Sequence, residues 1–201
     1  MVELHRFEIL PNVGDGLIDS RGESIRRQLE SDHSVSIRSV RSTLGYLVKA
    51  QFTENEKNRA ATELFSDPVL EEVSINSPIL ESSKFTSLPD ISILIGFKPG
   101  VTDNRAQAAL DGLQTLFPTH EKIAVSTTIG YHFWGVPSDL DLQWLMGQLH
   151  NPLIELAKSV DRRTSLNEPW PSLDFPERPI LEQTPPSVSY THLTLPTKRI
   201  V

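Results

Sequence analysis

The chain repeats its own sequence, and this duplication constrains its fold more than any other feature. The matched segments are 16–21 (GLIDSR) with 100–105 (GVTDNR), 44–46 (LGY) with 129–131 (IGY), and 67–71 (DPVLE) with 151–155 (NPLIE). The outer pairs are offset by 84 positions and the middle pair by 85. Three ordered matches at nearly one spacing predict a duplicated unit of roughly 75 residues, and two copies form a pair of related domains rather than a solenoid.

Composition and charge narrow the class of protein. The 201 residues are 38% hydrophobic and 22% charged, as in ordinary globular proteins. The formal charge of −7 disfavours a nucleic-acid or anionic-membrane surface, each of which needs clustered positive charge. The chain has no cysteine and therefore no disulfide, thiol nucleophile or Cys-ligated metal. No apolar run approaches the roughly 20 residues that span a bilayer, so we expect a cytoplasmic protein without nucleic-acid or membrane partners.

Hydrophobic periodicity predicts the same order of elements in both copies. Strands are predicted at 4–10, 35–40, 46–52 and 70–75 in the first copy, and at 91–95, 123–125, 131–134 and 153–160 in the second. Gly45 is placed near a turn between two of these strands. Helices are predicted to begin at cap-type residues with a polar partner three positions later, namely Ser20, Thr53, Asn104 and Ser138.

This order, β-α-β-β-α-β in each copy, predicts an α+β protein with two ferredoxin-like units in tandem and helices on one face of antiparallel sheets. The predicted organisation is unit one at 1–76, a linker at 77–89, unit two at 90–160 and a proline-rich connector at 161–187. Gly112 and Gly147 interrupt the helices of unit two. Each costs roughly 0.5–1 kcal/mol relative to alanine there, so we expect each glycine to allow close packing of a partner.

The last segment has a different origin. Residues 188–197 (VSYTHLTLPT) resemble one reading frame of a transposase adaptor end used in sequencing libraries. We therefore expect the natural sequence to be interrupted near Ser187 and exclude residues 188–201 from the fold.

No catalytic motif stands out. The sequence has no P-loop, GxGxxG, HExxH or GxSxG, and its histidines show no metal-ligand spacing, so we predict no catalytic residue and no metal site in this chain. The candidate ligand or interface residues lie in one strand-to-helix turn: Lys98, Gly100, Thr102, Asp103, Asn104 and Arg105. A glycine turn that leads into a helix N-terminus can hold an anion. The alternative interpretation is a simple turn in which Asp103 or Asn104 caps the helix.

Four strings resemble PurS-like domains. They are 95–104 (IGFKPGVTDN), 18–25 (IDSRGESI), 35–41 (VSIRSVR) and 64–69 (LFSDPV), and the likeness extends over about residues 4–160. Tandem PurS-like units occur at the N-terminus of fused phosphoribosylformylglycinamidine synthases. The resemblance implies a parent ligase of purine biosynthesis that amidates formylglycinamide ribonucleotide with ammonia from glutamine. It also implies that the synthetase part of the parent binds ATP and Mg²⁺.

By this resemblance the chain itself is a non-catalytic scaffold that needs no cofactor. Its implied partners are the synthetase and glutaminase parts of the same complex, and residues 161–187 lead into the synthetase. The scaffold hypothesis predicts association through sheets, either between the two units or with a second copy. An alternative is a tandem ACT-like sensor of small molecules, which has the same predicted topology and binds ligands near the first turn.

Overall fold

The computed structural model describes residues 2–14, 16–81, 85–165 and 168–177. The adaptor-like residues 188–201 and the end of the proline-rich connector lie outside the described residues. No helix in the described part of the chain is long and apolar enough to cross a membrane.

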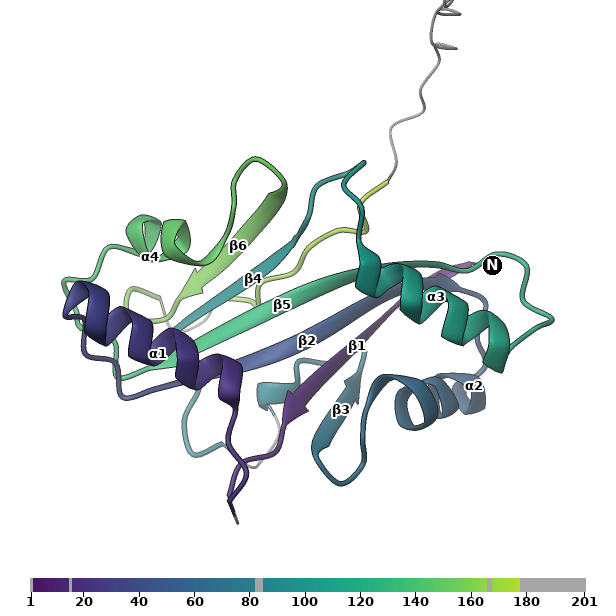
Figure 1. The fold of residues 1–201 in the computed structure, drawn as a ribbon, viewed down its shortest axis with the longest axis horizontal. Coiled ribbons are helices and arrows are strands. Elements are labelled where there is room, and N and C mark those ends of the chain that lie inside the picture. The colour runs from purple at the N-terminus through teal and green to yellow at the C-terminus, as the bar shows by residue number, and fades with distance from the viewer. Residues whose placement is uncertain (1, 15, 82–84, 166–167, 178–201) are drawn as a thin grey trace, which may run out of the picture.

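Each half of the chain contributes three strands and two helical segments. The first half contains β1 (Glu3–Pro11), α1 (Ser20–His33), β2 (Ser39–Ala50), α2 (Glu54–Arg59) with its π-helical continuation η1 (Ala60–Phe65), and β3 (Glu71–Ile75). The 3-10 turn η2 (Ile79–Glu81) follows. The second half contains β4 (Ile91–Phe97), α3 (Asn104–Leu116), β5 (Ala124–Trp134), α4 (Leu142–Leu149) and β6 (Glu155–Asp161). All six strands form one sheet in the order β3-β1-β2-β5-β4-β6, in which every neighbouring pair is antiparallel (Figure 1).

The α+β class and the antiparallel sheet are therefore confirmed, but the predicted β-α-β-β-α-β order is not found in either half. The strand predicted at 35–40 is found only from Ser39, where β2 begins, and β2 also includes most of the strand predicted at 46–52. The strands predicted at 123–125 and 131–134 are both part of the single strand β5. Gly45 lies inside β2 instead of in a turn, because it faces Thr128 of β5. A methyl group on Gly45 would lie 2.1 Å from Oγ1 of Thr128, so glycine is needed here for strand pairing.

The two halves are related by an approximate two-fold axis at the centre of the sheet. Strand β2 pairs with β5 from Ser39–Trp134 to Lys49–Ala124, and Leu44 faces Ile129 at the middle of this ladder. Positions 85 apart on these strands are therefore equivalent. The offset is the one that the repeated LGY and IGY segments have in the sequence.

The first helix of each half contacts the central strand of its own half, and its buried side chains join the core over the strands of the other half. Core one lies over β1 and β2. It includes Leu113 and Phe117 of the second half beside Phe7 and Phe65 of the first half. Core two lies over β4 and β5 and includes Leu29 of α1 beside Leu145 of α4. In Figure 1, α1 crosses the β4–β5 side of the sheet and α3 crosses the β1–β2 side. The halves therefore share both cores.

Both cores lie on the same face of the sheet, and later parts of the chain cover the opposite face. Leu10 and Trp134 pack there against Ile79 and Leu80 of η2. Residues 168–177 also lie on this face, where Nη2 of Arg6 donates a hydrogen bond of 3.0 Å to the carbonyl oxygen of Leu173. The predicted linker and connector thus contribute apolar side chains to the fold.

Aspartates cap three of the four long helices. Asp19, Asp103 and Asp141 are the N-caps of α1, α3 and α4, one to three residues away from the predictions. The predicted capping box at Thr53 and Glu56 is confirmed at the start of α2. Aspartate suits these positions because its carboxylate satisfies a backbone N–H that has no partner within the helix.

Candidate functional site

The predicted site residues lie in the turn between β4 and α3 and at the first two positions of α3, Asn104 and Arg105. Gly100 adopts φ = +87°, a conformation that glycine takes without strain. Asp103 caps α3 by accepting a hydrogen bond of 2.8 Å from the backbone N–H of Ala106. Lys98 points away from the helix start, since its Nζ donates to the carbonyl oxygen of Pro152. Its backbone N–H donates to Ile154, which fixes the turn against β6.

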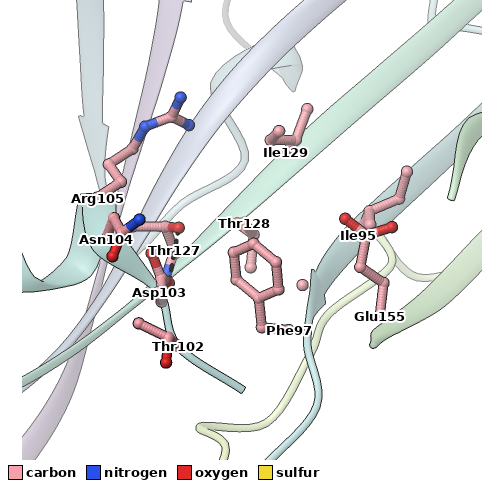
Figure 2. A pocket seen from close by; sticks show the side chains of 11 residues that line it. Ile95, Phe97, Thr102, Asp103, Asn104, Arg105, Thr127, Thr128, Ile129 and Glu155 are labelled. Carbon is pink, nitrogen blue, oxygen red and sulfur yellow. Dashed lines mark hydrogen bonds between the residues drawn. The ribbon is translucent and has the colours of Figure 1, made fainter. Parts of the chain in front are cut away.

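A cavity of about 220 Å³ opens beside this turn (Figure 2). It brings together four of the six predicted residues, Thr102, Asp103, Asn104 and Arg105, with side chains from β4, β5 and β6. Lys98 and Gly100 do not line it. The other lining residues are Ile95, Gly96, Phe97, Thr127, Thr128, Ile129 and Glu155. We call this space the upper hollow.

The upper hollow exists because β4 and β5 separate. Their pairing ends at Gly96–Thr128, and the backbone N–H of Thr127 then has no strand partner. Asp103 supplies one, because its Oδ2 accepts 2.8 Å hydrogen bonds from both the N–H and the Oγ1 of Thr127. One carboxylate therefore caps a helix and closes the end of a strand ladder, which leaves a gap between the strands.

The first half repeats this arrangement. Asp19 accepts from the N–H of Gly22 and from the Oγ of Ser42, each at 2.8 Å, and also from the N–H of Ser42. Asp19 and Asp103 differ in burial, since Asp19 is 5% exposed and Asp103 is only partly buried. The capping carboxylate is therefore buried in the first half and partly exposed to solvent in the second.

The charges in the upper hollow do not favour an anion. Asp103 and Glu155 contribute carboxylates, against the single guanidinium of Arg105. In Figure 2 the Arg105 side chain extends away from the ring of Phe97. Burial raises the pKa of nearby Tyr46, and the positive charge of Arg105 partly opposes this effect.

A second hollow of about 260 Å³ adjoins the gap on the opposite face of the sheet. It shares Gly96, Phe97, Thr127 and Thr128 with the upper hollow. Ser126 and Lys158 line it, and residues 173–177 form one wall. We call it the lower hollow.

The sequence interpretation missed Phe97, Thr127 and Glu155 as lining residues. The sequence held a signal for two of them. Glu155 repeats Glu71 within the duplicated turn, and Thr127 follows Asp103 in the sequence by nearly the same number of residues as Ser42 follows Asp19. Phe97 has no such signal, since the equivalent residue is Pro11.

A buried histidine lies elsewhere. His132 lies on the face of the sheet opposite to the two cores, which we call the lower face. Its Nε2 is 3.1 Å from the hydroxyl oxygen of Thr43, and its Nδ1 is 3.1 Å from that of Ser92. Burial, together with the positive charges of Arg162 and Arg41, lowers the pKa of His132 to about 3. A neutral histidine between two hydroxyl groups serves packing and hydrogen bonding. Among the described residues, no group of three or more His, Cys, Asp or Glu side chains is placed to hold a metal ion.

Neither family models nor curated proteins match this chain.

Proposed function

We propose that this chain is the PurS-like scaffold region of a phosphoribosylformylglycinamidine synthase, which organises the synthetase and glutaminase parts without catalysing a step itself. The pairing of β2 with β5 carries the proposal. Sheet association between the units is what the scaffold hypothesis predicts, and the shared cores make the two units one body. Tandem ferredoxin-like ancestry with three strands retained in each unit is part of this proposal.

ATP and Mg²⁺ belong to the synthetase part of the proposed parent. The sequence offers no glycine-rich phosphate loop for a nucleotide and no cysteine for glutamine hydrolysis. We therefore assign no catalytic step to residues of this chain.

A corner of the molecule suits a scaffold role. We define the corner patch as five exposed aliphatic residues: Val13, Leu17, Ile18, Val69 and Leu70. Two hydrogen bonds from Asn12 hold its two loops together, from the N–H to the carbonyl oxygen of Leu70 at 2.8 Å and from Nδ2 to that of Val69 at 3.2 Å. Ile18 is 69% exposed and Val69 is 75% exposed. Grouped exposed aliphatics typically mark a protein contact, and we assign this one to the synthetase part.

The test is binding of the full chain to separately purified synthetase and glutaminase chains of such an enzyme, measured by size-exclusion chromatography and calorimetry. We expect a stable complex with the synthetase. Val69→Asp and Ile18→Asp should each weaken it at least tenfold, because each places a charge in the contact. Leu88→Asp is the matched control, since Leu88 is 45% exposed and lies outside the corner patch.

Absence of any complex with either chain would contradict the scaffold proposal. Equal binding by Val69→Asp, Ile18→Asp and the wild type would retain the scaffold but reject the corner patch as its contact.

A second candidate, the ACT-like sensor, is favoured by one observation, the upper hollow at the start of α3. Thermal-shift screening with amino acids and nucleotides separates the candidates. A shift of several degrees with one amino acid, without binding of either enzyme chain, would favour the sensor. Binding of the synthetase without any ligand response would favour the scaffold.

A further inference from the structure

The first half of the chain shows what fills the strand gap there. Arg41 is the equivalent of Ser126, 85 positions earlier on the paired strands β2 and β5. Its guanidinium lies where β1 and β2 have separated. Nη2 of Arg41 donates to the carbonyl oxygen of Pro11, and Nε lies 3.5 Å from Oδ2 of Asp19. The Arg41 side chain is only 14% exposed, so the guanidinium is an internal part of this half.

The second half has the same acceptors without the arginine. Asp103 takes the place of Asp19, and Phe97 stands at the register position of Pro11. Ser126 replaces Arg41 with a side chain too short to reach the gap, and the hollows of about 220 and 260 Å³ open there on the two faces of the sheet. The partial exposure of Asp103, against 5% for Asp19, is the direct consequence.

The surroundings favour a cation. The carboxylates that line the two hollows are Asp103, Glu155, Asp174 and Glu177, and the cations are Arg105 and Lys158. Glu177 is already paired with Lys49 at 2.7 Å, which leaves three carboxylates against two cations. An aromatic residue is present in both halves: the ring centroid of Phe85 lies 5.9 Å from the guanidinium carbon of Arg41, and Phe97 lines both hollows. An aromatic face attracts a guanidinium ion.

We propose that the gap between β4 and β5 is a binding site for an external guanidinium group, which would take the place that the Arg41 side chain takes in the first half. The planar fork donates to Oδ2 of Asp103 and to the carbonyl oxygen of Phe97, at the places where Arg41 forms an ion pair with Asp19 and donates to Pro11. Its source is either a small guanidino compound or an arginine side chain of another protein. This inference does not rest on the proposed scaffold function.

The test uses the full chain and methylguanidine as the probe, with methylammonium and sodium chloride at equal concentration as controls. We expect saturable binding of methylguanidine, followed by NMR at the amides of Gly96 and Thr127, and a rise in melting temperature that the controls do not reproduce. Ser126→Arg should lose this response, because the new side chain fills the gap from within. Asp103→Asn keeps an oxygen for the helix cap but loses the charge, and should weaken binding at least tenfold.

The matched control opens the equivalent gap in the first half. Arg41→Ser should melt at a lower temperature than the wild type, and methylguanidine should restore part of the difference by filling the vacated place. Rescue of Arg41→Ser without saturable binding to the wild type would overturn the proposal, since the probe would then recognise the first gap and not the second. Unchanged binding to a folded Ser126→Arg variant would also overturn it. If that variant does not fold, unchanged binding to Asp103→Asn has the same meaning.

Two further ligands identify the source of the group. Binding of free L-arginine at least as tight as that of methylguanidine supports a small-molecule site. Binding of a blocked Gly-Arg-Gly peptide, but not of L-arginine, supports the site and assigns it to an arginine side chain of a partner protein.

Discussion

Core one, under α3 and η1, is filled with aromatic rings and alanines, whereas core two, under α1 and α4, is filled mainly with branched aliphatic side chains. In core one the Tyr46 and Phe65 rings stack at 4.4 Å. In core two, Ile91 and Ile93 are completely buried beneath Leu145. The aspartate that closes the end of each strand ladder is the same in both halves. The comparison shows that the polar closure of the strand ends is the same in both halves whereas the apolar filling differs, because packing tolerates exchange at roughly constant volume.

The strongest challenge to this comparison is to separate the halves. Residues 1–81 and 85–201, expressed apart, should each lack a cooperative thermal transition, and mixing should restore it. The reason is that core one depends on Leu113 of the second half and core two on Leu29 of the first, both at most 1% exposed. Circular dichroism with thermal unfolding is the measurement. A half that melts cooperatively as a monomer would show that the cores are independent.

The next largest effect should come from shortening one buried leucine side chain in α3 or in α1, the helices that contribute to the core over the other half. Leu113→Ala and Leu29→Ala should each lower the free energy of unfolding by about 2–5 kcal/mol, because each leaves a cavity in a closed core. Urea denaturation measures both, and a single transition in each variant would show that the cores unfold together. Leu88→Ala is the control, and at 45% exposure it should change stability by less than about 0.5 kcal/mol. Two separate transitions would contradict the shared fold.

We expect the contribution of the lower face to stability to depend on pH, because His132 lies there. The native state keeps His132 neutral down to about pH 3, whereas the unfolded chain takes up the proton near 6.5. Its contribution to stability is therefore complete above pH 6.5 and declines as the pH falls toward 3, by up to about 1.4 kcal/mol per pH unit.

Urea denaturation between pH 6.5 and 4.5 isolates this effect from Glu56, whose pKa is lowered from 4.5 to about 2 by the Thr53 N–H and His120. His132→Gln should reduce the pH slope, and the exposed His33→Gln is the matched control. His5, whose pKa burial also lowers, and Glu8, whose pKa burial raises, contribute to the slope that remains. An identical slope in His132→Gln and the wild type would refute the assignment.

The smallest effects should distinguish the two helix glycines of the second half. Gly147→Ala should raise stability by about 0.4–1 kcal/mol, because a methyl group there has nothing within 4 Å and restricts the unfolded chain. Gly112→Ala should not, because its methyl group would lie 2.5 Å from Cδ1 of Leu64. Thermal melting of the two variants tests this contrast, and stabilisation by Gly112→Ala would show that Leu64 moves aside freely.

Local signals in the sequence were sufficient for the turns and for most helix positions. The capping box at Thr53 and the duplicated turns at 67–71 and 151–155 depend on residues within five positions of one another. Gly112 packs closely against Leu64 of the same chain and Gly147 has open space, and the packing of a partner at these positions stays a prediction. The cap of α1 moved from Ser20 to Asp19, because Asp19 also binds Ser42, 23 residues later.

Non-local pairing decided what the sequence interpretation did not find. Glycine is typical of turns, yet Gly45 and Gly130 each lie opposite a threonine across the β2–β5 pair. Only the threonine on the partner strand explains why a glycine is needed at these positions. The turn residues of the candidate site were found because they are adjacent in the chain. The gap beside them was not, since it depends on where β4 and β5 stop pairing and on the small size of Ser126.

The shared cores have a consequence for synthesis on the ribosome. Core one needs residues from Phe7 to Phe117, and core two needs residues from Leu29 to Leu145. While the first half is being made, the apolar side of α1 emerges long before β4 and β5, whose side chains complete the core around it. The nascent chain must therefore keep aliphatic surface exposed until most of the polypeptide has left the exit tunnel. At that stage binding by a chaperone, or pairing with a neighbouring nascent chain, competes with the correct fold.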